Sequence, residues 1–283
     1  MLLFIAGLAA ILAPILMWRA EIEQDAQEYE RLCMQVEIVP QDESDVKATV
    51  EGDTEDEAEM PPVIGRWLPD VLEQPVIETA AEPDSAALSL SGSGSKAVVD
   101  FAALKASNAD IIAWLRIPGT TVDYPVVQSD DTEYYLNHTF TGKESSIGTL
   151  FSLENADYQT PGRNIAIYGH HLRSTTKMFS PLMSYKKKSF YENHKTVYLD
   201  SMYFSASYTV YAVANMTVGE WEPSEADFAD DADFLAFVSR ARSQALYDTG
   251  IDVGADDQIL TLITCDRDFA GKDGRLVVMA VRQ

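Results

Sequence analysis

The stretch QILTLITC at residues 258–265, followed by DRDFAGKDG at 266–274 and RLVVMAVRQ at 275–283, decides the fold and points to the chemistry. Both apolar runs are short and are separated by a polar loop, so they predict two neighbouring strands. Cys265 ends the first run and Arg275 opens the second. If the strands form a hairpin, this thiol and this guanidinium lie close together in space.

A cysteine at the end of a strand is exposed enough to react, whereas a cysteine in the middle of a strand is usually an inert part of the core. A guanidinium beside Cys265 would stabilise a thiolate, or an oxyanion forming on a carbonyl group that the thiolate attacks. The alternative is an ordinary hairpin with a surface arginine, and spacing alone leaves both interpretations open.

Further short runs bounded by turn residues precede this hairpin, and together they predict a mainly β fold, a barrel or sandwich of seven to eight strands. The earlier runs are TVDYPVVQ (121–128), IGTLFSL (147–153), NIAIYGH (164–170), KTVYLD (195–200) and YTVYAVANMTV (208–218). Helical spacing of apolar residues predicts a lead-in helix that continues to Trp114 and a helix around 178–194. A long helix over 224–246 is expected to begin with Ser224 as its N-cap.

The histidines help to decide which reaction Cys265 could carry out. His170 and His171 follow the run NIAIYG, so their rings are expected at the edge of a sheet, whereas His138 and His194 have polar or helical surroundings typical of surface or structural residues. A cysteine nucleophile needs a histidine to form a thiolate–imidazolium pair or to transfer protons. The paired histidines are the best candidates, and spacing does not choose between them.

Two other kinds of site are disfavoured. A zinc site needs three or more ligands at close spacing, and two adjacent histidines with a distant cysteine do not supply them. A papain-like peptidase places its cysteine before its histidine, in a different sequence context, whereas here the histidines come first. We therefore expect neither a metal nor another cofactor.

The charge is unevenly distributed along the 283 residues, whose formal net charge is −24. Residues 19–95 hold twenty acidic and four basic side chains, a net charge of −16, and residues 96–283 hold 25 acidic and 17 basic ones, a net charge of −8. Nucleic acids and anionic lipid surfaces require a basic footprint, so neither is an expected partner of the domain.

Residues 1–18, MLLFIAGLAAILAPILMW, carry no charge and end in a tryptophan, which favours the membrane interface. At about 1.5 Å per residue, a helix of this length just spans a hydrocarbon core of about 30 Å. We expect a transmembrane anchor; a cleaved signal peptide and a buried core helix are the alternatives. The missing basic n-region and cleavage site weaken the signal-peptide interpretation, and the anchor also lacks a basic cytoplasmic flank.

Residues 19–96 are expected to form an acidic, largely disordered stalk. Residues 19–38 have helix-forming composition and could extend the anchor as an exposed helix, whereas 40–95 lose periodicity and collect Pro, Ser, Gly, Asp and Glu. Cys33 lies in this stalk, and a disulfide between Cys33 and Cys265 is improbable.

Several segments together resemble a class B sortase, a surface cysteine transpeptidase found mainly in Gram-positive bacteria. The resemblance runs from about Val98 to Arg282, and TLITC fits the TLxTC signature of sortases. The segments that carry it, in the order and rough spacing of the family, are WLRIPGTTVDYPVVQ (114–128), DTEYYLNHTF (131–140), NIAIYGHHL (164–172), MFSPLMSYKKKSFYENHKTVYLD (178–200), TLITC (261–265) and RLVVMAVR (275–282).

The helix after Trp221 and the lead-in helix favour class B over class A. The absence of an apolar segment after Gln283 and of an Asp-Pro-aromatic lid motif disfavours the pilin-type class C. The acidic stalk is longer than the lead-in of typical class B enzymes.

The resemblance implies a sortase-type closed β-barrel with an N-terminal helical lead-in and a long helix before the penultimate strand, and it places the catalytic domain at 97–283. It assigns the catalytic roles to His170, Cys265 and Arg275, with His170 chosen over His171 because it directly follows the glycine of the YGH turn. Residues implied to bind the peptide substrate are Asn137, Trp221, Ile263 and Asp266. For Trp221, a buried or capping aromatic residue is the alternative.

The resemblance further implies that Cys265 cleaves a C-terminal sorting signal after a threonine through a thioacyl intermediate, and that a peptidoglycan amine resolves it. The implied partners are surface proteins bearing such a signal, the peptidoglycan precursor or cross-bridge, and the membrane, with the catalytic domain outside the cell. Two alternatives remain: a pilin-polymerising sortase with a lysine acceptor, and a membrane-tethered domain that only binds a partner.

Overall fold

The computed structural model describes residues 99–283 except 174, and, in the N-terminal part, Met17, Ala20, Glu23, Gln24, Asp25, Gln27, Tyr29 and Arg31. The expected anchor at 1–18, apart from Met17, and the acidic stretch 40–95 with Cys33 lie outside the described residues. Among the residues that are described, no helix combines the length and the apolar character needed to cross a membrane.

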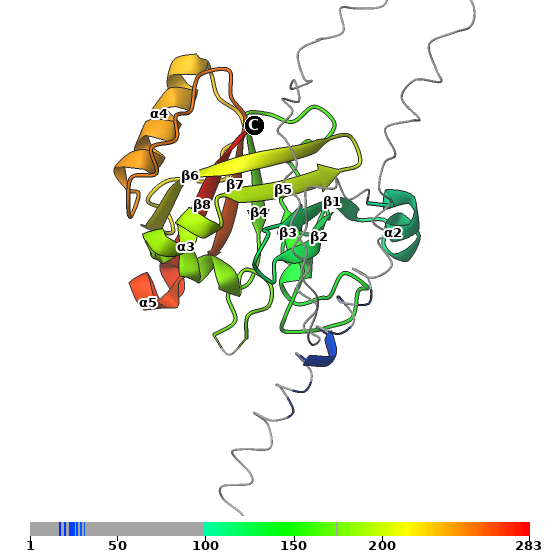
Figure 1. The fold of residues 1–283 in the computed structure, drawn as a ribbon. Helices are drawn as coiled ribbons and strands as arrows, with labels where there is room; N and C mark the ends of the chain where they lie inside the picture. The colour runs from blue at the N-terminus through cyan, green and yellow to red at the C-terminus, as the bar shows by residue number, and fades with distance from the viewer. Residues whose placement is uncertain are drawn as a thin grey trace, which may run out of the picture. The chain divides into compact units, whose positions relative to one another are not determined.

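Eight strands form a closed barrel, which confirms the predicted fold class (Figure 1). The strands are β1 (Ile111–Arg116), β2 (Asp123–Gln128), β3 (Leu150–Ser152), β4 (Asn164–Tyr168), β5 (Thr196–Ser201), β6 (Ser205–Thr217), β7 (Ile259–Cys265) and β8 (Gly274–Arg282). Their order around the barrel is β1-β2-β3-β4-β7-β8-β6-β5. The pairs β2–β3 and β4–β7 are parallel, and the other neighbours are antiparallel.

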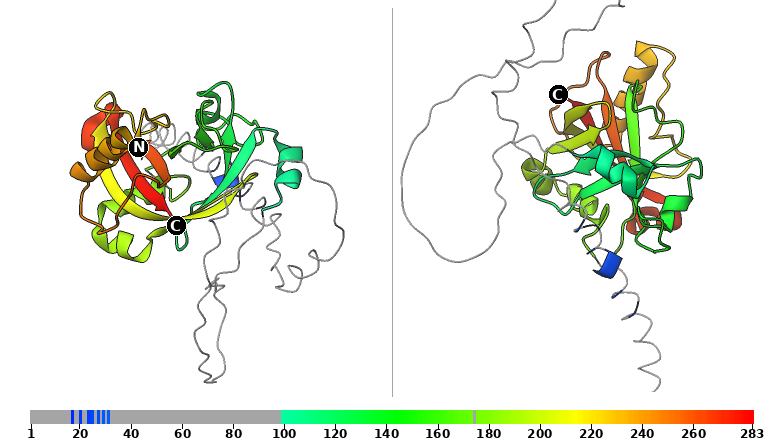
Figure 2. Two further views of the ribbon diagram at one scale, coloured as in Figure 1. Left: turned by 90° about the horizontal axis from the view of Figure 1, so that it is seen from above. Right: turned by 90° about the vertical axis from the view of Figure 1, so that its right-hand side faces the viewer.

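Short helices lie between the strands. The α-helices after the N-terminal part are α2 (Phe101–Ser107), α3 (Lys188–Asn193), α4 (Asp231–Ser243) and α5 (Arg267–Ala270), and the 3₁₀ helices are η2 (Tyr134–Leu136), η3 (Ser180–Lys186) and η4 (Gly271–Asp273). In the two further views of Figure 2, α4 lies outside the barrel on the side of the C-terminal strands. The long helix before the penultimate strand is therefore present as predicted.

Two helix boundaries differ from the sequence prediction. The lead-in helix ends at Ser107, and the apolar run before Trp114 is strand β1. The long helix begins after Asp230, whose side chain accepts a hydrogen bond from the Asp233 amide, and not at Ser224. Ser224 instead donates its hydroxyl proton to Glu222 within the preceding loop.

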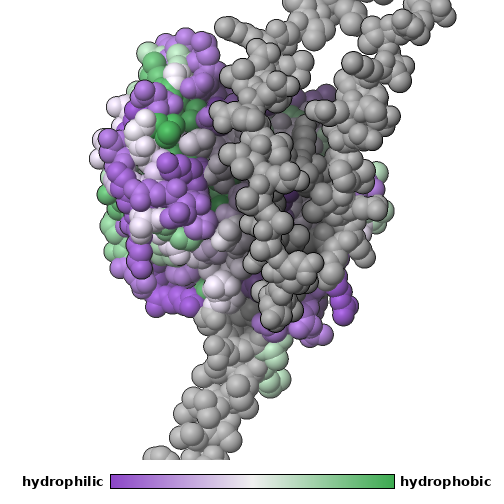
Figure 3. Space-filling model, viewed as in Figure 1, coloured by the Kyte–Doolittle hydropathy of each residue, from purple (hydrophilic) through white to green (hydrophobic). Residues whose placement is uncertain are grey.

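Alternating residues of the strands face two cores. On β7, Leu260 and Leu262 belong to one apolar cluster, whereas Ile259 and Ile263 belong to a second cluster that contains the buried face of α4. Successive side chains of a strand point to opposite faces, so Cys265 lies on the same face as Ile263. The coloured surface in Figure 3 is mainly hydrophilic, with apolar residues in small patches.

Candidate active site

Strands β7 and β8 form the predicted hairpin, and Cys265 is directly opposite Arg275 in its antiparallel register. Opposite residues of an antiparallel pair place their Cβ atoms about 4.5–5.5 Å apart on the same face. Cys265 is a free thiol and is half-buried. The hairpin therefore brings the thiol and the guanidinium together, as the spacing in the sequence predicted.

The Arg275 guanidinium is held beside the hairpin turn by main-chain carbonyls. Its Nη1 donates to the oxygen of Lys272 at 3.0 Å and to that of Gly274 at 2.9 Å. A guanidinium has five N–H donors, so these two bonds leave donors for a further acceptor. The turn thus fixes where the cation sits without consuming its capacity to bind an anion.

A third strand brings the histidines to the same end of the sheet. Strand β4 runs parallel to β7, with Tyr168 opposite Ile263, and the Gly169 amide donates to the Ile263 carbonyl at 3.2 Å. His170 follows Tyr168 by two residues, as Cys265 follows Ile263 by two residues. The chain segment that carries the histidines therefore leaves β4 alongside the end of β7.

Both histidines of the pair are half-buried and close to this end of β7. The Nε2 atom of His170 donates to the carbonyl of Leu136 at 2.8 Å, whereas the Nδ1 atom of His171 donates to the carbonyl of Cys265 at 3.1 Å. Each ring consequently has one nitrogen committed to a main-chain oxygen. The assignment of the catalytic role to His170 remains a proposal.

The other two histidines have local contacts. His138 stacks on Tyr134 with ring centroids 3.9 Å apart, and His194 stacks on Phe190 at the same distance. Their Nδ1 atoms bond to the carbonyl four residues earlier in the chain. These contacts are those of structural residues.

The four residues implied to bind a peptide differ in exposure. Asn137 is exposed at the end of η2, but Trp221 is only 8% exposed and packs edge-on against Phe237. Ile263 is 2% exposed and belongs to the second core. A side chain buried in this way meets a ligand only where its neighbours leave it uncovered.

Asp266 is the most deeply buried of these four residues. It is fully buried and forms an ion pair with Lys186 of η3. A buried carboxylate needs such a partner because desolvation of an unpaired charge is costly. Its position directly after Cys265 makes it a residue that fixes the end of β7.

Tyr168 was missed by the sequence analysis, although it lies in the quoted run NIAIYGH. It shares a face with Ile263, and its side chain lies near Ser224 and Arg275. Burial raises the pKa of Tyr168 above its usual value, and a hydrogen bond with Ser224 opposes this effect. Only the parallel pairing of β4 with β7, which no local pattern shows, could have indicated it.

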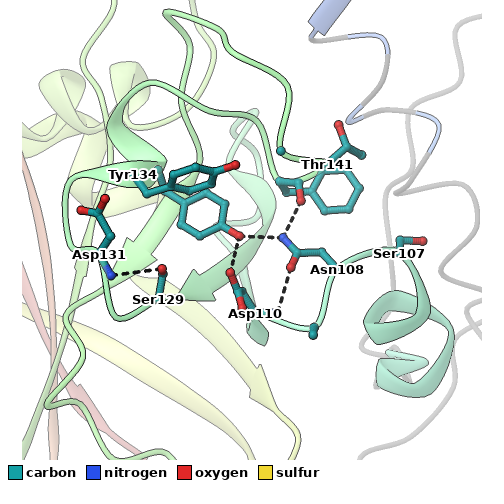
Figure 4. Close-up of a pocket in the computed structure, with 11 residues that line it drawn as sticks. Ser107, Asn108, Asp110, Ser129, Asp131, Tyr134 and Thr141 are labelled. Atoms are coloured by element: carbon teal, nitrogen blue, oxygen red, sulfur yellow. Dashed lines mark hydrogen bonds between the residues drawn. The ribbon is translucent and has the colours of Figure 1, made fainter.

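Neither of two pockets in the described structure is lined by Cys265 or Arg275. One, of about 440 Å³, lies beside Asn108, Asp110 and Tyr135, which hydrogen-bond to one another (Figure 4). The other, of about 480 Å³, lies between α4 and the loop that contains Trp221. Within the described part of the chain, no group of three or more His, Cys, Asp or Glu side chains is arranged to hold a metal ion.

Known proteins resemble this chain in sequence and in fold. The Sortase domain family matches residues 115–283. Sortase B of Staphylococcus aureus is 31% identical over 180 residues, which are 64% of this chain and 73% of the relative, and Sortase B of Listeria monocytogenes is 30% identical over 175 residues, 62% and 70% of the two chains. The solved Staphylococcus aureus sortase B–substrate complex superimposes with a TM-score of 0.61 at 30% identity, covering 65% of this chain and 84% of the other.

The match begins near the end of β1 and covers all later strands, including the hairpin that carries Cys265 and Arg275 and the strand that precedes the paired histidines. The chain therefore belongs to the sortase family and is a class B sortase, a cysteine transpeptidase.

Proposed function

We propose that the enzyme cleaves a C-terminal sorting signal of a surface protein after a threonine, and joins the new carboxyl end to a peptidoglycan amine. The observation that carries this proposal is the cross-strand pair of Cys265 and Arg275, with the thiol half-buried at the end of β7. A nucleophile and a fixed cation side by side are what acyl transfer needs.

In the first step, the Cys265 thiolate attacks the carbonyl carbon of the threonine, and the electron pair of the C=O bond moves to the oxygen. Arg275 stabilises this oxyanion with the N–H donors that the turn leaves available. The intermediate collapses, the C–N bond breaks, and the His170 imidazolium gives its proton to the departing amine. A thioester between Cys265 and the threonine remains.

In the second step, the acceptor amine attacks the thioester carbonyl. His170 takes the proton from the attacking nitrogen, the C–S bond breaks, and the Cys265 thiolate is restored. The product is an amide, so the bond energy of the original peptide is conserved in the thioester and no other reactant is consumed. His170 is again an imidazolium and the enzyme is ready for the next cycle.

The face of the sheet on which Cys265 lies supplies a surface that the peptide can contact. Tyr168 and Trp221 border this face, and Asn137 is exposed on the segment whose Leu136 carbonyl holds His170. We assign peptide contacts to these residues, and we assign to Asp266 the task of holding the end of β7 through Lys186.

Sortase relatives are cell-surface enzymes. We propose that residues 1–18 anchor this one in the membrane and that residues 97–283 catalyse the reaction outside the cell. The acidic stretch after the N-terminal helix would act as a spacer, because like charges repel one another and resist collapse onto anionic lipid.

The test is incubation of the full chain with a library of five-residue sorting peptides and candidate amines, with the products identified by mass. We expect an amide product, a thioacyl adduct on Cys265, and no product from the Cys265→Ala variant. A ladder of linked partner proteins instead of attachment to wall fragments would establish the pilin-polymerising alternative. Turnover by Cys265→Ala, or an inactive His171→Ala beside an active His170→Ala, would contradict the assignment.

A further inference from the structure

The N-terminal helix carries two side chains that are buried against the barrel domain. The described residues between Met17 and Arg31 are helical, in a segment for which the sequence predicted an exposed helix. Asp25 and Tyr29, four residues apart and so on one face of this helix, are 0% and 2% exposed. That prediction of exposure is therefore wrong for one face of the helix.

Asp25 binds the loop between η2 and β3 through its carboxylate. Its Oδ1 lies 2.6 Å from the Nζ atom of Lys143, and its Oδ2 accepts the hydroxyl of Ser145. A fully buried carboxylate is stable only when paired and hydrogen-bonded. Loss of Lys143 would remove the cation that compensates this charge, so the contact ties the helix to the loop.

Tyr29 binds the same loop through its hydroxyl. The hydroxyl donates to the carbonyl of Gly148 at 2.8 Å, accepts the amide of Phe140 at 3.2 Å, and lies 2.9 Å from the hydroxyl of Thr149. Its ring packs edge-on against Tyr124 with centroids 5.5 Å apart. One hydroxyl therefore joins Phe140, near the start of the loop, to Gly148 and Thr149 at its end.

This loop holds His170. The Leu136 carbonyl accepts the Nε2 proton of His170, and Gly148 lies against the same ring, since a Cβ atom there would be 3.0 Å from His170 Cδ2. The two limbs of the loop are linked by the Thr149 amide, which donates to the Tyr135 carbonyl at 3.0 Å. Contacts thus run without a break from Tyr29 through the loop to the imidazole.

The opposite side of the loop is held by the turn after α2. Asn108 donates to the hydroxyl of Tyr135 and to the carbonyl of Phe140, and Tyr135 donates to Asp110 (Figure 4). The barrel domain supplies this support by itself. The support on the Gly148 side comes from the N-terminal helix, whose Tyr29 lies 119 residues before Gly148 in the chain.

We propose that Asp25 and Tyr29 are positioning residues, and that the N-terminal helix fixes the loop 136–149 so that His170 is correctly placed for catalysis. The inference rests on the role of His170 proposed above. A displacement of about 1 Å in a catalytic group can lower a rate by about 100-fold. The N-terminal helix is in this respect part of the catalytic unit.

The test uses the full chain with Tyr29→Phe, which removes only the hydroxyl, and Asp25→Asn, which removes only the charge. Matched controls are Tyr203→Phe at a surface tyrosine that is 50% exposed, and Glu23→Gln at an exposed acid of the same helix. The readouts are kcat and KM with the sorting peptide, and the rate at which iodoacetamide alkylates Cys265, followed by peptide mass.

We expect Tyr29→Phe and Asp25→Asn to lower kcat and the alkylation rate about 10-fold with KM nearly unchanged, as for a catalytic group moved by less than about 1 Å. The controls should match the wild type. In a His170→Ala background, neither substitution should slow alkylation any further, because its effect passes through the imidazole.

Two results would overturn the positioning role: wild-type alkylation and turnover in both variants, or equal slowing with and without His170. The result that contradicts the proposed function is different. If His170→Ala alone is alkylated and turns over like the wild type, His170 is not the catalytic histidine, and the present inference falls with it.

Discussion

The two halves of the proposed catalytic site are built in different ways. Cys265 and Arg275 lie on neighbouring strands, and the ladder between β7 and β8 fixes their register from Ile259 to Cys265. His170 lies beyond the end of β4, and its ring is held by the carbonyl of Leu136, more than thirty residues earlier in the chain. Main-chain pairing therefore sets one half, whereas contacts between distant loops set the other.

This difference predicts where each half is vulnerable. For the pair on the two strands, we expect activity to be lost when the thiol, the guanidinium or the turn between the strands is changed. For the imidazole held by the loop, we expect activity to be lost also when residues that never touch the substrate are changed. The following variants test that contrast.

Arg275→Ala should have the largest effect on the strand-held half. Loss of an oxyanion donor is expected to lower kcat by about 10²–10³-fold. Arg267→Ala removes an exposed cation from the same connection and should leave kcat unchanged. Steady-state kinetics with the sorting peptide measures both, and a loss confined to KM would show that Arg275 only binds the substrate.

Gly274→Ala should damage the hairpin turn. A Cβ atom at Gly274 would lie 2.2 Å from the Asp266 carbonyl oxygen and 2.8 Å from the Ala270 amide, both main-chain atoms that cannot move aside cheaply. We expect the free energy of unfolding to fall by about 1–3 kcal/mol, together with a loss of kcat as Arg275 shifts. Urea denaturation measures the first quantity.

The control for this variant is Gly254→Ala, where the nearest atom to an added Cβ is the Asp257 Oδ2 at 3.6 Å. Its free energy of unfolding should stay close to that of the wild type. Equal stability of the two variants would show that the hairpin turn adapts more easily than its geometry implies.

Gly148→Ala tests the loop-held half. Gly148 has a φ of +63°, and an added Cβ would lie 2.7 Å from the Tyr135 carbonyl oxygen and 3.0 Å from His170 Cδ2. A displacement of a catalytic group by about 1 Å can lower a rate by about 100-fold. We expect a smaller displacement of His170 here, and therefore a fall in kcat of about 10-fold.

Gly142→Ala is the matched control, because Gly142 has a φ of +79° and lies in the same loop, but its nearest neighbour is 3.4 Å away. Both variants bear the cost of a left-handed residue, and only Gly148→Ala crowds the histidine. Equal kcat values for the two variants would argue against a tight link between this loop and His170.

Tyr168→Phe should have the smallest effect. Burial raises the pKa of Tyr168 above its usual value of about 10, so the phenol is protonated across the whole neutral range and contributes no titration there. We expect the pH–rate profile to be unchanged and KM to rise about threefold, as for the loss of one neutral hydrogen bond. A profile that changes below pH 9 would contradict this.

Apart from β1, which was predicted as part of the lead-in helix, the strand pattern was predictable because it is local. The runs of apolar residues, the turn residues between them and the ten-residue spacing of Cys265 and Arg275 are all visible in the chain. The helix boundaries were harder. Ser224 and Asp230 are both good N-cap residues, and the hydrogen bonds of the surrounding loop decide between them.

Burial was the other quantity that the sequence could not supply. Asp25, Tyr29 and Asp266 belong to acidic or polar stretches and read as solvent-exposed, yet each finds a partner far away in the chain. A buried polar side chain is stable because of that partner, and the residues next to it in the sequence do not predict the contact.

The sequence by itself determined the barrel strands other than β1 and the meeting of Cys265 with Arg275, because strand period and hairpin connection are set by residues close together in the chain. Its resemblance to class B sortases determined the class of enzyme. Only the tertiary structure decided how the histidines approach the thiol, which neighbours enclose Asp266, and that the N-terminal helix reaches the loop behind His170. These features depend on non-local packing, in which segments separated by up to about 120 residues satisfy one another's hydrogen bonds.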